Sequence, residues 1–144
     1  MRDGEVVFDD GEKTVHTFNE NGLCVQTIDY DANGNIRFDI RYQIDPLQRI
    51  VGWTVLDGRG ETVKRFEVDF NSQNMEIEKR QFGADGMLER QQRYIYDNDN
   101  RRVEEQHFDS TGMLRSRKVF TSIDGETSEK YYDLQGNLLS GPAA

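Results

Sequence analysis

A short turn motif recurs along the whole chain. It consists of an aromatic or large apolar residue, then Asp or Asn, two polar residues, and Gly or Asn, as in Tyr30-Asp31-Ala32-Asn33-Gly34. Self-similarity of this kind is typical of repeat architectures, in which each unit packs only against its neighbours. The motif therefore constrains the fold more than any single residue does.

The spacing of the motif shows that the repeating unit is a pair. Successive apolar positions of the motif are separated alternately by 12 and 14 residues along most of the chain. Every second position therefore recurs after 26 residues, as Phe18 and Ile44 do. The apolar positions are Phe18, Tyr30, Ile44, Leu56, Phe70, Phe82, Tyr96, Phe108, Phe120 and Tyr132. The register loses two residues before Phe120, and Phe8-Asp9-Asp10-Gly11 resembles a shortened first member. Two unlike half-repeats thus alternate along the chain.

The turn residues predict β-hairpins. A glycine follows four residues after many of the apolar positions, at Gly22, Gly34, Gly60, Gly86, Gly112 and Gly136. Because Gly takes positive φ without steric cost, this pattern predicts a type I turn closed by a G1 bulge. In the half-repeat that begins at Phe18, the copies after Gly22 have Gln48, Asn74 and Asn100 at this position, and Asn tolerates that conformation best after Gly. Pro46 occupies a position at which proline presets φ for the same turn.

The segments between the turns read as strands. In residues 36–44 apolar Ile, Phe and Tyr alternate with polar residues, a period of two that a helix would scatter around its circumference. Fewer than ten residues separate most turns, which leaves no room for helices of ordinary length. The sequence predicts an all-β fold: an antiparallel up-and-down meander of about ten or eleven strands built from tandem hairpins, in one open or curled sheet.

Two apolar columns conflict with a regular strand. Val25 and Val51 belong to one column and Tyr30 and Leu56 to another, and the columns are five residues apart, so regular alternation directs them to opposite faces. A bulge between the columns would restore a common face, and Gly52 offers a place for it. The alternative is a sheet with apolar residues on both faces. The sequence leaves both open.

Composition bounds the class of protein. The 144 residues predict a single repeat domain over residues 1–144, or a segment of a larger repeat protein. A hydrophobic fraction of 35% and a charged fraction of 31% favour a single layer over a thick sandwich. The net charge of −9 argues against nucleic acid as a partner. No secretory signal or membrane span is visible, and a single cysteine, Cys24, excludes an intrachain disulfide and leaves the compartment open.

The sequence contains no convincing metal-binding or catalytic motif. Residues 31–35 and 97–100 resemble the start of an EF-hand loop, but the Gly and Glu that such a loop requires later are absent, and turn formation explains these residues more simply. His16 and His107 have no zinc-ligand spacing, and no serine stands in a Gly-x-Ser-x-Gly context. We expect no enzymatic activity, no cofactor and no metal site.

The aromatic residues offer a possible binding surface. Tyr42, Trp53, Phe66 and Tyr94 could align across strands into a ladder. Such a ladder is either part of the sheet's own core or an exposed platform on which sugar rings or an extended partner could stack.

Basic residues cluster at residues 90–93, 101–102 and 115–118. We expect them to pair across strands with Glu76, Glu78, Glu104 and Glu105 rather than to form an anion site.

The turn motif resembles the YD repeats of the RHS family. The resemblance rests on residues 29–36 and is echoed in residues 108–114 and 132–138, although the alternating 12 and 14 residue spacing differs from the common YD spacing. It implies a long strip of antiparallel strands that winds into a shell around a toxin or effector segment of secreted or surface bacterial proteins, with carbohydrate binding sometimes proposed. The matching Tyr and Asp positions are structural in that family. An extracellular or cell-surface location is favoured by this resemblance alone.

These observations lead to one main hypothesis about function. We expect a non-enzymatic structural or interaction repeat module of a bacterial surface or secreted protein, whose β-sheet acts as scaffold or shell. Its partners would be another protein or adjacent repeats, and unpaired edge strands would favour self-association. The alternative is a carbohydrate-binding module that uses the aromatic ladder.

Overall fold

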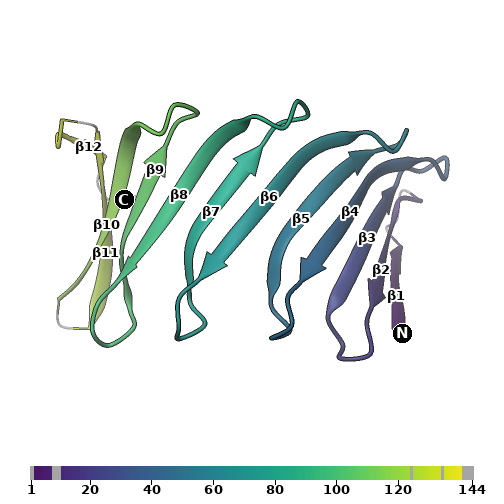
Figure 1. The fold of residues 1–144 in the computed structure, drawn as a ribbon, viewed down its shortest axis with the longest axis horizontal. Helices are drawn as coiled ribbons and strands as arrows, with labels where there is room; N and C mark the ends of the chain where they lie inside the picture. Colours follow the sequence, from purple (N-terminus) through teal and green to yellow (C-terminus); the bar gives the residue numbers. More distant parts are fainter. Residues whose placement is uncertain (1, 8–10, 124, 134, 141–144) are drawn as a thin grey trace. The chain divides into compact units, whose positions relative to one another are not determined.

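The computed structural model describes residues 2–7, 11–123, 125–133 and 135–140. In these residues the chain forms twelve β-strands and no helix, and the strands lie in sequence order (Figure 1). The predicted all-β meander is confirmed. The strand number exceeds ten or eleven because a three-residue strand follows the last turn. The shortened turn expected at Phe8 involves residues 8–10, which lie outside the described residues.

The strands have lengths of three to ten residues. They are β1 (Arg2–Val7), β2 (Lys13–Phe18), β3 (Cys24–Tyr30), β4 (Ile36–Ile44), β5 (Ile50–Asp57), β6 (Thr62–Phe70), β7 (Glu76–Phe82), β8 (Leu88–Tyr96), β9 (Arg102–Phe108), β10 (Leu114–Ile123), β11 (Glu126–Asp133) and β12 (Leu138–Ser140).

The chain divides into two compact units. The first comprises Met1–Val68 and Phe82–Met87, and the second comprises Asp69–Gln81 and Leu88–Ala144. In the first unit, strands β1 to β6 pair antiparallel in sequence order. In the second unit, strands β8 to β12 do the same. Each unit is therefore a succession of hairpins.

The predicted turn geometry is confirmed. In the turn after Tyr30, Gly34 donates its N–H to the carbonyl of Asp31 at 3.0 Å and has a φ of 83°. The other predicted glycines also have positive φ, and so do Gln48, Asn74 and Asn100, each at 63°. Both half-repeats thus end in the same turn. One closes it with glycine, at Gly34, Gly60, Gly86 and Gly112, and the other with Gly22 in its first copy and with Gln48, Asn74 and Asn100 in the next three.

A side-chain carboxylate or amide stabilises most of these turns. The Oδ1 atom of Asp31 accepts the backbone N–H groups of Asn33 and Asn35, both at 2.9 Å. The same two hydrogen bonds are made by Asn19, Asp45, Asp57, Asn71, Asp97, Asp109 and Asp133. The Asp-rich segments that resemble calcium loops therefore serve turn formation.

One predicted turn is wrong. Strand β10 continues through Phe120 to Ile123, which pairs with Glu126, so only two residues connect β10 and β11. The second of them, Gly125, has a φ of 82°. Asp-Gly is a strong signal for a two-residue hairpin. The register therefore loses its two residues in this loop and not before Phe120.

A second irregularity recurs near the start of the strands. Gln43 opposes Gly52 while Ile44 opposes Ile50, so Val51 is an extra residue, and the same shift falls at Val25. This confirms a bulge next to Gly52. The equivalent bulge in β4 falls at Arg37, and Arg37 and the next residue, Phe38, line the same hollow. A bulge at this position therefore directs consecutive side chains to one face, so we place Val51 on the face of Gly52 and Leu56.

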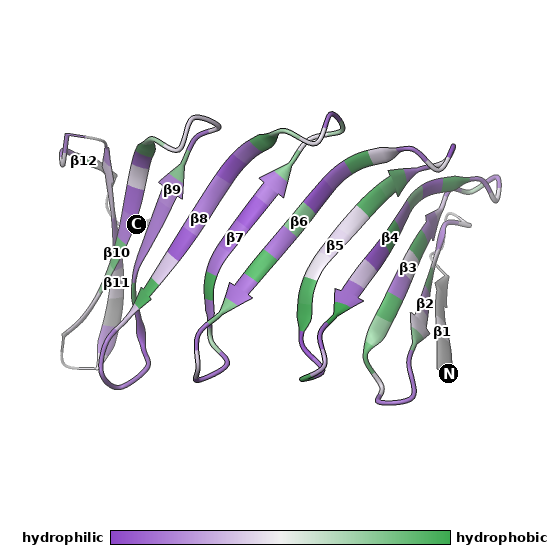
Figure 2. Ribbon diagram, in the orientation of Figure 1, coloured by the Kyte–Doolittle hydropathy of each residue, from purple (hydrophilic) through white to green (hydrophobic). Residues whose placement is uncertain are grey.

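The bulge does not gather all apolar residues on one face. In the first unit, Ile40 opposes Val55 on one face, and Leu56 opposes Asp39 on the other. Figure 2 shows the alternation of apolar and polar residues along β4. Among the described residues no side chain is fully buried, and the buried apolar ones are Leu56, Val68 and Tyr94. Packing is therefore lateral, between neighbours within a layer.

Candidate functional site

Three of the four aromatic residues predicted to form a binding surface come together. Tyr42 of β4 opposes Trp53 of β5, and Trp53 opposes Phe66 of β6. The Trp53 and Phe66 rings are stacked with centroids 4.9 Å apart, and the Tyr42 ring is tilted at 6.5 Å from Trp53. The aromatic ladder of the first unit thus consists of Tyr42, Trp53 and Phe66.

The ladder is both packing and surface. All three side chains are half-buried, so each ring packs against its neighbour and also reaches solvent. Directly opposed aromatic residues stabilise a sheet, and stacked pairs add to the contribution of burial.

Gly52, next to Trp53, lies where no larger residue fits. A Cβ atom there would lie 2.7 Å from both the Gln43 Oε1 atom and the Phe66 carbonyl oxygen. The Gln43 side chain could turn away, but the Phe66 carbonyl belongs to the backbone of β6. Glycine at residue 52 therefore allows β5 and β6 to approach closely beside the ladder.

The fourth predicted residue, Tyr94, lies on β8 in the second unit. The residue is 9% exposed, and its hydroxyl donates to the Gln92 Oε1 atom at 2.8 Å. The Arg102 guanidinium lies 4.0 Å from the centroid of its ring. Burial, with the charge of Glu76, raises the pKa of Tyr94 to about 12. Tyr94 is therefore part of the packing of its own unit.

A hollow of about 540 Å³ opens on the face that carries the ladder. Ile40 and Val55 oppose each other in it and stand two residues from Tyr42 and Trp53 on their strands, so they share the ladder's face. The hollow is lined by Glu12, Thr14, Thr27, Asp29, Arg37, Phe38, Ile40 and Val55. No feature of the sequence pattern predicted it, because its residues come from the start of β2 and from three further strands.

An ion-paired arginine forms one wall of the hollow. The two terminal nitrogens of Arg37 donate to the two carboxylate oxygens of Glu12, each at 2.9 Å. One of them also donates to the Asp29 Oδ1 atom at 3.3 Å, and Asp29 accepts the Thr14 hydroxyl at 3.4 Å. The hydrogen bonds with Glu12 and then Asp29 raise the pKa of Arg37 above its ordinary value. The guanidinium is thus already engaged by two carboxylates.

The single cysteine and both histidines lie in polar contacts of the sheet. The His16 Nδ1 atom lies 3.0 Å from the Thr27 hydroxyl, and the Cys24 sulfur lies 3.4 Å from the same hydroxyl. The His107 Nδ1 atom lies 3.2 Å from the Gln92 amide nitrogen, and burial lowers the pKa of His107.

Some of the predicted cross-strand ion pairs form in the second unit, whereas Arg102 pairs with Glu105 within β9 and Arg115 pairs with Asp109 of the preceding turn. Arg93 pairs with Glu78 at 3.0 Å, Arg117 with Glu104 at 3.2 Å, and Lys118 with Glu105 at 3.8 Å. A smaller hollow of about 370 Å³ lies beside the first of these pairs. Much of the basic charge in this unit is therefore matched by carboxylates of neighbouring strands.

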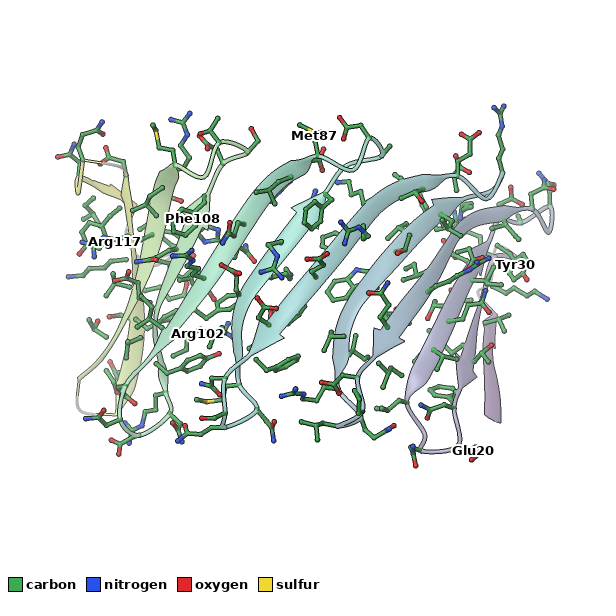
Figure 3. The ribbon with its side chains drawn as sticks, viewed as in Figure 1. Glu20, Tyr30, Met87, Arg102, Phe108 and Arg117 are labelled. Atoms are coloured by element: carbon green, nitrogen blue, oxygen red, sulfur yellow. The ribbon has the colours of Figure 1, made fainter. Side chains whose placement is uncertain are left out.

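The basic residues have a second role that the sequence interpretation missed. The side-chain nitrogen of Lys13 lies 5.2 Å from the Tyr30 ring centroid, and the guanidinium of Arg117 lies 4.8 Å from that of Tyr132. Arg65 over Phe82 and Arg93 over Phe108 make the same contact. Figure 3 labels Tyr30, Phe108 and Arg117. These contacts have a counterpart in the sequence. A basic residue stands 15 or 17 positions before each of the aromatic residues Tyr30, Phe82, Phe108 and Tyr132, and this spacing could have predicted cations over the rings.

The described part of the chain lacks two kinds of feature. Residues 2–7, 11–123, 125–133 and 135–140 contain no group of three or more His, Cys, Asp or Glu side chains placed to hold a metal ion. They also contain no helix that is long and apolar enough to cross a membrane.

No protein-family model matches the sequence, and no curated protein matches it. Among solved structures, the crystal structure of TcdB2-TccC3-Cdc42 is similar over 92% of this chain, with 15% identity and a TM-score of 0.33. This chain spans 9% of the length of that one. A porin-like protein from Bacteroides uniformis is similar over 91% of this chain and 58% of its own, with 11% identity and a TM-score of 0.36. These likenesses are too distant to assign a function or a partner.

Proposed function

We propose that the chain is a non-enzymatic structural repeat module that associates with other protein segments through its β-sheet. The observation that carries the proposal is the recurrence of one hairpin geometry in both units, with a positive φ at the same turn position in nine described turns, from Gly22 to Gly112 and at Gly136. Modules of this kind are stabilised by neighbouring repeats, and their surfaces serve as scaffold. The resemblance of the turn motif to YD repeats agrees with such a role.

The terminal strands supply the means of association. Among the described residues β1 pairs with β2 alone, and β12 pairs with β11 through Tyr131 and Tyr132. Strand β11 runs from Glu126 to Asp133, so a large part of it has a described partner only in β10. Unpaired strand edges bind further strands, either from adjacent repeats or from another chain.

Light scattering over a range of protein concentrations tests this proposal. We expect the mass to rise above the 16.7 kDa of one chain as concentration increases. Added salt should strengthen the association, because it screens the repulsion between copies of net charge −9. A mass of one chain at every concentration and salt level would contradict association through the edges.

A second candidate function, carbohydrate binding, is favoured by the aromatic ladder alone. The half-buried rings of Tyr42, Trp53 and Phe66 form a row, although Trp53 and Phe66 each turn one face toward the other. Binding to a glycan array should then be lost in Trp53→Ala and kept in Phe108→Ala, a matched aromatic substitution in the second unit. Array binding that Trp53→Ala leaves unchanged would remove this candidate.

A further inference from the structure

The hollow of the first unit joins an apolar floor to a charged wall. Phe38, Ile40 and Val55 supply the apolar part, and Phe38 is 44% exposed. Glu12 and Asp29 supply the carboxylates of the wall. We propose that this hollow binds a Lys or Arg side chain of a partner chain, with its aliphatic stem on the floor and its cationic head at the wall. The inference rests on the proposed function and names the chemistry of the partner.

The charge around the hollow favours a cation. Arg37 is held by Glu12 in a bidentate pair and by Asp29, so its guanidinium has little capacity left for an anionic ligand. Two further charges flank the floor on the same face: Asp57 directly opposes Phe38, and Lys64 directly opposes Val55. Together with Asp57, whose Oδ1 atom also accepts two backbone N–H groups of its own turn, three carboxylates lie on this face with two cations, which leaves one negative charge in excess. The face of the Phe38 ring also attracts cations.

The size and surroundings of the hollow favour a side chain on a polypeptide. Its volume of about 540 Å³ exceeds what one alkyl ammonium group fills. The floor continues through Ile40 and Val55 to the ladder residues Tyr42 and Trp53 on the same face. A basic residue flanked by apolar residues would therefore bury its neighbours on the ladder while its head reaches Glu12 and Asp29.

Small probes test the charge preference. Amide NMR spectra of the chain should show saturable shifts at Thr14, Thr27 and Phe38 with n-butylammonium, the analogue of a lysine side chain. We expect n-butanol and butyrate to bind at least fivefold more weakly, because they lack the positive charge. Equal binding of the three probes would overturn the proposal.

Capped tripeptides test whether the ligand belongs to a polypeptide. Ac-Leu-Lys-Leu-NH₂ should bind at least threefold more tightly than n-butylammonium, because its leucines reach the ladder. Replacing its lysine by norleucine should lower the affinity at least fivefold. Binding of the free amine that equals binding of the tripeptide would overturn the assignment to a partner chain.

Two charge variants of the hollow should change its ligand preference in opposite directions. Misfolding would weaken the binding of both probes and could not produce this result. Arg37→Gln makes the hollow more negative and should strengthen n-butylammonium binding at least twofold. The double variant Glu12→Gln and Asp29→Asn leaves an excess of positive charge and should invert the preference toward butyrate. Arg41→Gln is the matched control, because Arg41 is 62% exposed and lies on the opposite face of β4. An unchanged preference in both hollow variants would overturn the inference.

The experiments distinguish a failure of cation binding at the hollow from a failure of association through the strand edges. A chain that associates in light scattering but shows no charge preference at the hollow contradicts only the inference. A chain that stays a single copy but binds the lysine tripeptide selectively contradicts edge association and supports the hollow.

Discussion

At the residue scale, the hairpin ends depend on one left-handed residue each. Gly34 has a φ of 83°, and a Cβ atom added to it would meet nothing within 4 Å. The need for glycine there is therefore conformational and not steric. Asn100 shows that asparagine can take the same place in the other half-repeat, with a φ of 63°.

Substitutions at Gly34 should separate these effects. We expect Gly34→Ala to lower the free energy of unfolding by about 1 kcal/mol, because a left-handed conformation disfavours residues with a Cβ. Gly34→Asn should cost less than half as much. Urea unfolding of both variants measures the difference, and equal losses would show that conformation is not the cause.

The turn carboxylates make stability depend on pH. In Asp109, the Thr111 hydroxyl at 2.6 Å, the backbone N–H groups of Thr111 and Met113, and Arg115 hold the pKa at about 2, below the ordinary 3.8. The pKas of Asp45 and Asp133 are also lowered, chiefly by backbone N–H groups in the case of Asp133. Since the folded-state pKa is the lower one, the stabilisation is complete above pH 3.8 and is lost as pH falls toward 2.

Replacement of Asp109 by asparagine tests this pH dependence. Asp109→Asn keeps an Oδ1 acceptor, as Asn19 and Asn71 do in equivalent turns, but cannot titrate. Its urea midpoint should fall less between pH 5 and pH 2 than that of the parent chain. An NMR titration should find the Asp109 carboxyl well below its ordinary pKa, and a value near 3.8 would contradict the turn hydrogen bonds.

At the scale of the element, β4, β5 and β6 are held in register by bulges and by the aromatic ladder. The bulge at Val51 fixes which residue opposes which, and the ladder then aligns Tyr42, Trp53 and Phe66 across three strands. Gly52 permits the close approach of β5 to β6 beside the ladder. Register, bulge and ladder therefore support the same strand pairing.

A double-mutant cycle measures the coupling within the ladder. Trp53→Ala and Phe66→Ala should couple by about 0.5–1.5 kcal/mol, because their rings stack. Tyr42 and Trp53 should couple more weakly, since their rings are tilted at 6.5 Å. Tyr42 and Phe66, two strands apart, serve as the control and should be nearly additive. Additive losses for Trp53 and Phe66 would show that the stacking does not stabilise the sheet.

The strands and turns could be predicted wherever residues close in sequence determine them. A glycine or asparagine four residues after an apolar residue was enough to place the turns at Gly34 and Asn100 and the strands between them. The turn predicted after Phe120 was wrong because β10 continues to Ile123, which pairs with Glu126. The ladder of the first unit was predicted in part, since Tyr94 lies in the second unit.

The hollow was not predictable from spacing. It requires the bulge at Arg37, which brings this side chain to the face of Phe38, and partners from β2 and β3 that are distant in sequence. The cations over aromatic rings depend on similar cross-strand contacts, such as that of Arg117 with Tyr132. Side-chain neighbours across a sheet follow from register, and the register became known only with the bulges.

At the scale of the whole molecule, we infer that the chain is built from interchangeable 26-residue units. Residues 45–70 make up one such unit, because the turn that begins at Asp45 has its equivalent at Asn71. In a repeat protein, each added unit contributes its own stability and an interface with its neighbour. Stability should therefore follow the number of units.

The thermal unfolding midpoint of a repeat-number series is the most direct test. The series comprises the parent chain, a deletion of residues 45–70 and a tandem duplication of the same residues. We predict one cooperative transition in each, with a midpoint that rises from deletion to parent to duplication by at least about 3 °C per unit. A duplication of residues 45–69 is the control, because the missing residue breaks strand alternation and should lower the midpoint. A midpoint that falls when the complete unit is duplicated, or that does not change with the number of units, would contradict a modular architecture of 26-residue units.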